Sequence, residues 1–416
     1  MKKLRALAAA VAAVTVAGIF SACSSSETNN IPAETAAETE RVQADAVYST
    51  EEIFSSFNGA FLKEYLKEQD SFVISPLSAK LALSMAAAGA DSGSATEKEL
   101  LDLFGYGSKE DMLADCGRII SELDGSKTVD TANFAWISDR LEGLKDGYGD
   151  TLKEVFAAES FVSDLTSDNF VKRLNSRVSK ATKGMIPELL NAPLSEDARL
   201  ALVNALYFKN EWLFKFDEYS TRDRDFHGTG GTVQVPTMHM TKHLQYGEGK
   251  RFKSVQMFYT DGSYMTVYLP IDDTAQIADL IAEMSIDELN AEFEMEYGIK
   301  DVVLHMPKFE CKSGGSLVEM LERLGVREAF DPSSASFGGI ADSSDAALYI
   351  SEIIQAAKIV CDEEGTEAAA ATLVAMDAGG AMPAEDIIEF TVDRPFLYEI
   401  KTASGETLFM GVMQDI

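Results

Sequence analysis

Histidine and cysteine, the side chains that most often hold catalytic metals or act as nucleophiles, are scarce in this sequence, with 4 of each among 416 residues. His239 and His243 stand four positions apart, a spacing found in zinc sites. The catalytic Glu of an H-E-x-x-H motif is missing there, and the surrounding sequence is strand-like. We therefore interpret both as surface histidines and expect no metal site.

Motifs of the common catalytic machineries are also missing. The chain has no G-x-S-x-G elbow, Walker loop or dinucleotide-binding glycine pattern. Carboxylates are so numerous that no pair stands out as an acid and base. The sequence therefore favours a protein that is not an enzyme and needs no cofactor. A hydrolase that uses one of the serines with His239 or His305 stays open, and activity on small esters or peptides would reveal it.

The charge excludes several partners. The chain carries 36 Lys and Arg against 68 Asp and Glu, for a net charge of −32, which repels nucleic acid and anionic lipid headgroups. Its 46% hydrophobic residues suffice for a real core. The length allows one large domain or two ordinary ones.

The first residues are typical of a secretion signal. Residues 1–22 have a basic start, an apolar run and small residues before Cys23, which is typical of a lipoprotein signal peptide whose Cys23 becomes lipidated. A plain signal peptide that leaves Cys23 free is the alternative. Residues 23–46 are polar and acidic, so we expect a disordered tether. The other cysteines, Cys116, Cys311 and Cys361, are odd in number, and we expect buried thiols.

The remaining residues, 47–416, show no second linker or repeat. Helical patterns occupy residues 47–68, 76–90, 277–293 and 316–330, and Ser75 with Pro76 forms a cap and first turn. The apolar run at 76–90 predicts a buried helix. Strand patterns occupy residues 201–208, 264–269, 302–306, 347–354, 387–392 and 408–413. This order predicts an α+β domain around a large, mainly antiparallel or mixed sheet.

The most informative segment is D-E-E-G-T-E-A-A-A-A-T at residues 362–372. An alanine-rich surface helix is the simplest interpretation. Gly365 interrupts that helix, however, and the segment stands between two predicted strands. It therefore opens an exposed loop of about twenty residues, and loops of this length are usually functional.

This segment resembles the hinge of the reactive-centre loop of the serpins, a family of protease inhibitors. The hinge residues are Glu363, Gly365, Thr366, Glu367, Ala368, Ala369, Ala370, Ala371 and Thr372. Further landmarks of the family follow in its order, at residues 74–78, 89–90, 174–175, 203–209, 306–309, 324–326, 393–396 and 409–411. The resemblance covers residues 47–416 and implies a single serpin-like domain with mixed sheets and a long exposed loop.

The resemblance implies a function without catalytic groups of its own. In this family a target serine protease attacks the loop and forms a covalent acyl complex. The cleaved loop then inserts as a strand into the main sheet and distorts the protease. We therefore expect an irreversible, or suicide, inhibitor.

The period of the loop is compatible with insertion, since a strand buries alternate residues. From Thr366 onward, one face of the predicted strand carries no charge, and the two acidic residues, Glu367 and Asp377, lie on the other face. The first face consists of Thr366, Ala368, Ala370, Thr372, Val374 and Met376, and the second of Glu367, Ala369, Ala371, Leu373, Ala375 and Asp377. A charge on the first face would have cost several kcal/mol on burial. We expect Gly365 to permit the backbone rotation that starts insertion.

Family spacing from Gly365 places the scissile bond at Gly379–Gly380, with Ala378 and Met376 as alternates. Glycine or alanine before the bond suits the shallow primary pocket of elastase-like or subtilisin-like proteases. No Arg or Lys occurs between Asp362 and Arg394, which disfavours trypsin-like targets.

By the resemblance, Ser75, Ser78 and Asn204 belong to the shutter, a buried polar cluster under the strands that open. Gln355 takes the place of a histidine that is common there, and it cannot change charge with pH. Ser75 could instead be an ordinary helix cap, and Asn204 a hydrogen-bonded amide of the core. Both interpretations are compatible with a place in the shutter.

Trp212 and Lys308 map to the breach, where the loop first enters the sheet. Lys308 could pair with Glu363 there, although an ordinary surface ion pair is an open alternative. Arg177 stands where the family often has a Trp. This departure leaves undecided how easily the sheet opens, but not the fold.

The main alternative is a non-inhibitory serpin that acts as a binding or chaperone module. It would be cleaved without trapping the protease. In either case we expect a monomer outside the cytoplasm that is lipid-anchored to a bacterial cell membrane or released. We expect no nucleic acid and no heparin-like cofactor.

Overall fold

The computed structural model describes residues 56–68, 70–293, 295–342, 348–366 and 387–416, all of which belong to the unit Thr50–Ile416. Within these ranges the helices are too short or too polar to cross a membrane.

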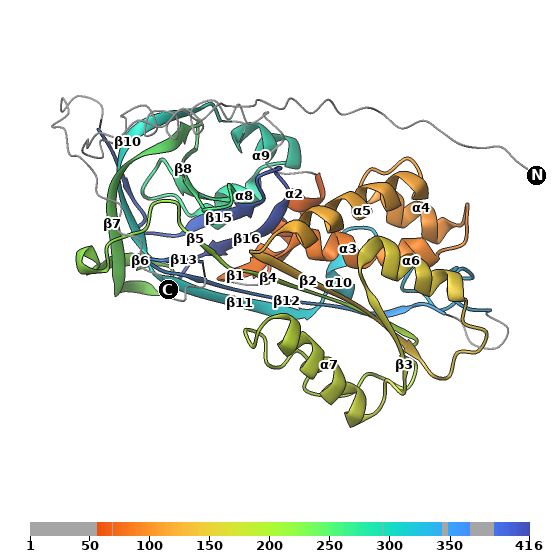
Figure 1. Cartoon of the computed structure of the whole chain (residues 1–416). Helices are drawn as coiled ribbons and strands as arrows, with labels where there is room; N and C mark the ends of the chain where they lie inside the picture. Colours follow the sequence, from red (N-terminus) through yellow and green to blue (C-terminus); the bar gives the residue numbers. More distant parts are fainter. Residues whose placement is uncertain (1–55, 69, 294, 343–347, 367–386) are drawn as a thin grey trace, which may run out of the picture. The chain divides into compact units, whose positions relative to one another are not determined.

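The strands of the described residues form two sheets (Figure 1). The first has the order β3-β2-β4-β12-β13-β5, and β11 pairs with the other edge of β12. In it β4 is parallel to β12 and β2 is parallel to β3, while the other pairs are antiparallel. Its strands are β2 (Val129–Ser138), β3 (Glu159–Ser163), β4 (Leu200–Phe208), β5 (Asn210–Glu211), β11 (Phe309–Ser316), β12 (Ile350–Cys361) and β13 (Gly365–Thr366).

The second sheet has the order β1-β16-β15-β9-β8-β7-β10-β14, and β6 pairs with β7. Only β10 and β14 are parallel in its described pairs. Its strands are β1 (Phe72–Ile74), β6 (Arg222–Gly228), β7 (Gly231–Glu248), β8 (Phe252–Phe258), β9 (Tyr264–Pro270), β10 (Tyr297–Pro307), β14 (Ile387–Thr391), β15 (Phe396–Lys401) and β16 (Thr407–Met413). The predicted α+β class with mixed, mainly antiparallel sheets is confirmed.

The helices lie largely before the strands of the second sheet in the chain. They are α2 (Ser56–Leu66), α3 (Pro76–Gly89), α4 (Ala95–Asp102), α5 (Lys109–Gly125), α6 (Asp146–Phe156), α7 (Asp168–Ala181), α8 (Ile277–Glu283), α9 (Ile286–Phe293) and α10 (Val318–Arg323), with a short 3-10 helix at Glu218–Ser220. As predicted, Ser75 caps α3 by accepting a hydrogen bond from the amide of Ser78, and α3 is buried along almost its whole length.

Two apolar clusters lie on opposite faces of the first sheet. The larger contains α3 and most of the second sheet. The smaller joins Phe170, Leu174 and Val178 of α7 to small residues of β4 and β12. Figure 1 shows α7 on one side of the sheet and α3 on the other.

Three predicted elements differ in extent. The helix at 277–293 is divided into α8 and α9, because Ser285 and Glu288 form a reciprocal cap between them. The helix at 316–330 is reduced to α10, which Gly325, at φ +105°, follows closely. The strand expected at 347–354 is β12, which begins at Ile350 and continues to Cys361.

Candidate functional site

The hinge segment begins as a tight turn between β12 and β13. The carboxylate of Asp362 accepts hydrogen bonds from the amides of Glu364 (2.9 Å) and Gly365 (3.3 Å), and the amide of Asp362 donates to the carbonyl of Gly365 (3.0 Å). This side-chain turn brings Thr366 opposite Cys361. The turn reverses the chain, so the residue that enters the sheet is Thr366.

Gly365 is required here for space. A Cβ on Gly365 would lie 2.0 Å from the carbonyl oxygen of Asn210, which pairs with β13 as part of β5. Its φ lies outside the left-handed region that glycine alone adopts readily. In the structure Gly365 therefore permits a close approach of two backbones, and this differs from the rotational freedom that we expected from the sequence.

Thr366 is buried and hydrogen-bonded. Only 2% of its surface is exposed, and its hydroxyl lies 2.6 Å from the hydroxyl of Tyr259. The ring of Tyr259 stacks on Trp212, with centroids 4.3 Å apart. Trp212 in turn donates from Nε1 to the carbonyl of Asp362 (2.9 Å). Trp212 thus supports both ends of the hinge turn.

The two glutamates of the hinge turn have cationic partners. Glu363 is buried, with its carboxylate 2.6 Å from Nζ of Lys308 and 2.8 Å from the hydroxyl of Thr221, which donates to it. Burial alone would raise the pKa of Glu363, but these hydrogen bonds outweigh it and lower the pKa. Glu364 pairs with Lys215. Because Glu363 is buried, its pair with Lys308 is more than an ordinary surface ion pair.

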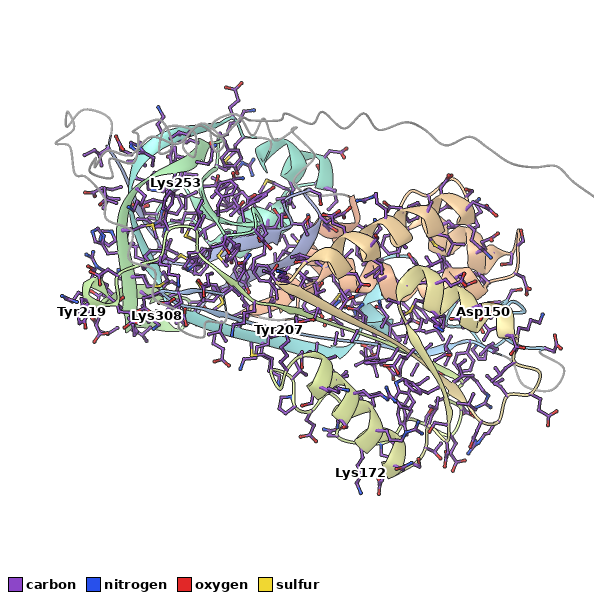
Figure 2. The ribbon with its side chains drawn as sticks, viewed as in Figure 1. Asp150, Lys172, Tyr207, Tyr219, Lys253 and Lys308 are labelled. Atoms are coloured by element: carbon purple, nitrogen blue, oxygen red, sulfur yellow. The ribbon has the colours of Figure 1, made fainter. Side chains whose placement is uncertain are left out.

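Lys308 lies close to the Thr221 turn, at the end of the sheet where Tyr219 is also found (Figure 2). We keep the name breach for Trp212, Tyr259, Lys308, Glu363 and Thr366. Tyr259 and Thr221 escaped the sequence reasoning, because a tyrosine and a threonine in polar turns carry no signal of their own.

The shutter residues form one chain of hydrogen bonds beneath β4 and β12. Gln355 donates from Nε2 to the carbonyl of Ser75 (2.8 Å) and accepts from the amide of Ser75 (3.2 Å). The hydroxyl of Ser78 donates to Asn204, which donates to Asn133. Asn133 donates to the carbonyl of Phe156 (2.7 Å). All five side chains are at most 3% exposed, so each polar group needs its partner.

Sequence reasoning missed Asn133, which the register of β2 and β4 places directly opposite Asn204. A polar residue within an apolar strand was the available signal. The other site residues predicted from the sequence have no described geometry. They are Cys23, Glu367, Ala368, Ala369, Ala370, Ala371, Thr372, Met376, Ala378, Gly379 and Gly380, and they lie outside the described residues.

The seam is the parallel junction of β4 and β12, and it includes the shutter pair of Gln355 and Asn204. It runs from Ile350 opposite Leu200 to Ala356 opposite Ala205. Beyond Ala356 the two strands are no longer paired, although β12 continues to Cys361. There β13 lies between β12 and β5. The sheet is therefore closed at the shutter and already divided at the breach.

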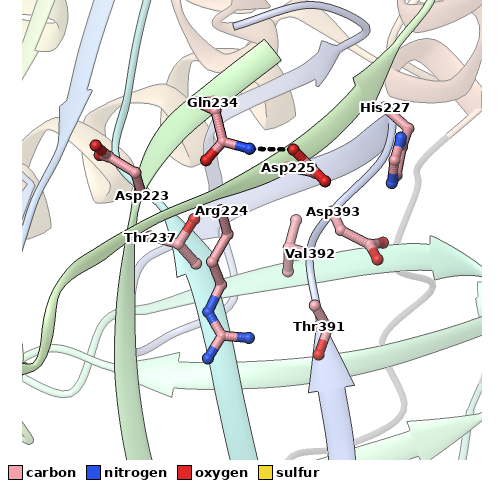
Figure 3. A pocket seen from close by; sticks show the side chains of 9 residues that line it. All are labelled: Asp223, Arg224, Asp225, His227, Gln234, Thr237, Thr391, Val392 and Asp393. Carbon is pink, nitrogen blue, oxygen red and sulfur yellow. Dashed lines mark hydrogen bonds between the residues drawn. The ribbon is translucent and has the colours of Figure 1, made fainter. Parts of the chain in front are cut away.

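The chain re-enters the sheets at β14, beside a surface cavity of about 350 Å³. Figure 3 shows this cavity with side chains from β6 and β7 and from residues 391–393. β14 pairs with β10, and the amide of His227 donates to the carbonyl of Asp393 (2.7 Å). Both described ends of the loop are thus held by backbone hydrogen bonds.

The histidines do not converge on a metal. His239 stacks on His305, with ring centroids 4.7 Å apart, whereas His243 pairs with Asp301 through Nδ1 (2.7 Å). In the part of the chain that the structure describes, no group of His, Cys, Asp or Glu could hold a metal ion. Cys116, Cys311 and Cys361 are free and buried, as predicted.

Comparison with known proteins gives a consistent result. A family model described as "Serpin (serine protease inhibitor)" matches residues 54–416. Iripin-5 of Ixodes ricinus is 31% identical over 82% of this chain and 88% of its own length. A leukocyte elastase inhibitor of Xenopus tropicalis is 31% identical over 81% of this chain and 91% of its own. The crystal structure of Serpin48 of Tenebrio molitor is similar with a TM-score of 0.77 and 29% identity, over 87% of this chain and 96% of that one.

Proposed function

The chain belongs to the serpin family, and on this premise we propose that it is a suicide inhibitor of serine proteases. Serpins are generally protease inhibitors and not enzymes. The observation that carries the proposal is the position of β13, which already occupies the place of an inserted strand at the open end of the seam.

The register of β13 defines where each later loop residue goes on insertion. Thr366 lies opposite Cys361 on one side and Asn210 on the other. In antiparallel pairing each further residue meets a partner one position earlier on both neighbours. Ala368 would then lie between Ile359 and Phe208. Thr372 would lie between Gln355 and Asn204, and Met376 would reach Leu200, where β4 begins.

This register places the uncharged face of the loop against the main core. Ile359 and Phe208, the partners of Ala368, belong to the larger apolar cluster. The partners of Thr372 are shutter residues, and its hydroxyl can join their hydrogen bonds there. The opposite face, which carries Glu367, points away from this cluster. Insertion thus buries no carboxylate in the core.

Strand exchange also supplies a driving force. The uncut protein joins β4 and β12 through one parallel ladder, and insertion replaces it by two antiparallel ladders. The inserted residues also bury apolar surface. Cleavage of the loop releases the strand from its anchor at β14 and so permits this change.

The same register bears on the bait residue. The inserted strand needs residues through Met376 to reach Leu200, the first residue of β4. A cut at Gly379–Gly380 therefore leaves three residues beyond Met376. Cleavage after Ala378 would also serve, whereas cleavage after Met376 would leave none. We therefore propose Gly379–Gly380, with Ala378 and Met376 as alternates.

The residues around this bond favour elastase-like or subtilisin-like targets. Glycine and alanine suit a shallow primary pocket, and the segment has no basic residue. One relative is named a leukocyte elastase inhibitor, which supports the same class.

We also propose that residues 1–22 are removed as a signal peptide, that residues 23–46 are a tether and that residues 47–416 are the serpin domain. Lipidated Cys23 would be the sole membrane attachment of a monomeric protein on a bacterial cell surface. Mass spectrometry of the cell-associated protein after delipidation would test the modification of Cys23.

The decisive experiment mixes the protein with neutrophil elastase, pancreatic elastase and subtilisin, followed by SDS gels and intact mass. We expect an SDS-stable complex and a released peptide that begins at Gly380. Complete loop cleavage by all three proteases without a complex, and without a higher melting temperature of the cleaved protein, would instead indicate a non-inhibitory binding module.

A further inference from the structure

A second cavity, of about 600 Å³, lies outside the hinge and the shutter. It lies between the end of α5, the start of β2, the turn before β9 and the turn between β15 and β16. Its lining residues are Glu122, Leu123, Gly125, Ser126, Lys127, Thr128, Val129, Thr260, Asp261, Ser263, Thr402, Ala403 and Leu408. The volume is that of a small-molecule site.

The cavity combines an apolar floor with acceptors. Leu123, Val129 and Leu408 are buried members of the main core. Asp261 accepts hydrogen bonds from the hydroxyl of Thr128 (2.5 Å) and from the amide (2.9 Å) and hydroxyl (2.5 Å) of Ser263. Asn210 makes a further, smaller hydrogen-bond contribution to this carboxylate, which offers about four acceptor sites, so a ligand would share the carboxylate with Asn210.

The local electrostatics favour a cation. Burial opposes the ionisation of Asp261, but the hydrogen bonds from Ser263 and Thr128 outweigh it and lower the pKa of its carboxyl. The helix α5 ends at the cavity with its negative pole and has no basic residue in its last turn. Glu122 adds a second carboxylate, which already pairs with Arg118 (3.4 Å) and accepts a hydrogen bond from Ser404, and Lys127 is the one basic lining residue.

The cavity wall is bonded to the strand that receives the hinge. The hydroxyl of Thr260 donates to Oδ1 of Asn210 (2.8 Å), and Nδ2 of Asn210 donates to the hydroxyl of Ser263 (3.3 Å). Asn210 belongs to β5 and lies opposite Thr366. The cavity also joins Val129 of β2 to the turns that flank β9 and β16. These belong to different sheets, so a ligand would tie the two sheets together.

We propose that this cavity binds an organic cation, a primary amine with an apolar body, and that the bound amine slows opening of the seam. The second part rests on the proposed inhibitory function, because opening matters only if the loop inserts. The ammonium group lies at the charged carboxylate of Asp261, and the apolar body lies on Leu123, Val129 and Leu408.

The test is a melting series of the full chain with 2-phenylethylamine, using 2-phenylethanol and 3-phenylpropionate as matched neutral and anionic probes. The amine raises the melting temperature in a saturable manner. The alcohol needs an at least tenfold higher concentration for the same shift, and the acid has no effect. Ala403→Trp, which fills the cavity from an exposed position, removes the amine effect.

Two further variants make the test independent of the folding of Ala403→Trp. Asp261→Asn lowers the affinity for the amine at least fivefold and leaves the affinity for the alcohol unchanged. Asp272→Asn is the control, because Asp272 also accepts two hydrogen bonds, from Thr274, but lies outside the cavity. An equal effect of 3-phenylpropionate, or an amine effect that survives in Asp261→Asn, overturns the proposal.

The coupling is read separately as the rate at which the SDS-stable elastase complex forms. Saturating amine lowers this rate severalfold in the parent protein and leaves it unchanged in Asp261→Asn. A melting shift without a change of rate retains the binding site and overturns the coupling. Failure to form any complex without amine counts against the proposed function alone.

Discussion

The breach and the shutter are both polar clusters at the seam of one sheet, yet they use different chemistry. The breach contains a charged pair, Glu363 with Lys308, whose lysine side chain is 38% exposed. The shutter is built from neutral groups alone, and its side chains are at most 3% exposed. Burying a charge without water costs far more than burying a paired amide, which explains why the charged pair belongs to the cluster that reaches solvent.

The difference separates two tasks along the path of the loop. In the proposed mechanism the breach holds the first residue that inserts, and it can respond to pH through the carboxylate of Glu363. The shutter keeps the lower seam closed through hydrogen bonds that carry no charge, and Gln355 leaves it without a titratable group. We therefore expect the shutter to determine stability, the breach to determine pH dependence, and the strand between them to determine inhibition.

The largest effect is expected from a charge placed just below the breach. In Ala368→Arg the guanidinium would have to lie between Ile359 and Phe208, so insertion stops and the protein becomes a substrate. SDS-stable complex should fall at least tenfold while loop cleavage continues. The matched control is Glu367→Arg, whose side chain points to the other face and should retain most of the complex. Equal yields from the two variants would falsify the insertion register.

Thr366→Arg should also convert the inhibitor into a substrate. Since Thr366 is already buried against Tyr259, this variant should lower the melting temperature of the uncut protein as well. A normal yield of SDS-stable complex from Thr366→Arg would count against burial of this face.

The next effect concerns the shutter. Asn204→Leu leaves the hydroxyl of Ser78 without an acceptor and the side-chain oxygen of Asn133 without a donor in a dry core, at a cost of about 2 to 4 kcal/mol. Denaturant unfolding should show this loss equally at pH 5 and pH 8, because no shutter side chain titrates there. A loss smaller than that of a breach variant would reverse the comparison.

A smaller effect is expected at the breach. Lys308→Met leaves Glu363 with Thr221 alone and should cost about 1 to 2 kcal/mol at pH 7. The pKa of Glu363 is lowered on folding, so its contribution is present above about 4.5 and is lost as pH falls through the folded value. Melting temperatures of parent and variant should therefore converge as the pH falls below about 4.5, and a constant gap would contradict the assignment.

The smallest effect lies beside β14. Burial, followed by the nearby charges of Arg224 and His239, lowers the pKa of His305. The unfolded chain then takes up the proton first, so stability declines as pH falls below about 6.5. His305→Gln should flatten the melting temperature between pH 7 and pH 5. His227→Gln, on the exposed strand β6, serves as the control and should leave that slope in place.

Much of the fold was predictable because its signals are local. Ser75 followed by Pro76 indicates a cap, and the continuous apolar run at 201–208 indicates the buried strand β4. The alternation from Thr366 onward predicts the face that insertion would bury, and Thr366, the described residue of that face, is buried. The predicted extents of the helices at 277–293 and 316–330 were wrong, because Ser285 and Gly325 act as caps only in the right backbone geometry.

The sequence by itself determined the class of fold and the hinge segment, and it indicated that Lys308 could pair with Glu363. Each of these depends on residue types within a few positions or on a family pattern. Only the tertiary structure decided that Asn133 meets Asn204, that Tyr259 bonds Thr366, and that Gly365 is needed for space beside Asn210. These contacts join segments that are far apart in the chain. Their existence depends on strand register, and register is fixed by the summed packing of both sheet faces and not by any one residue.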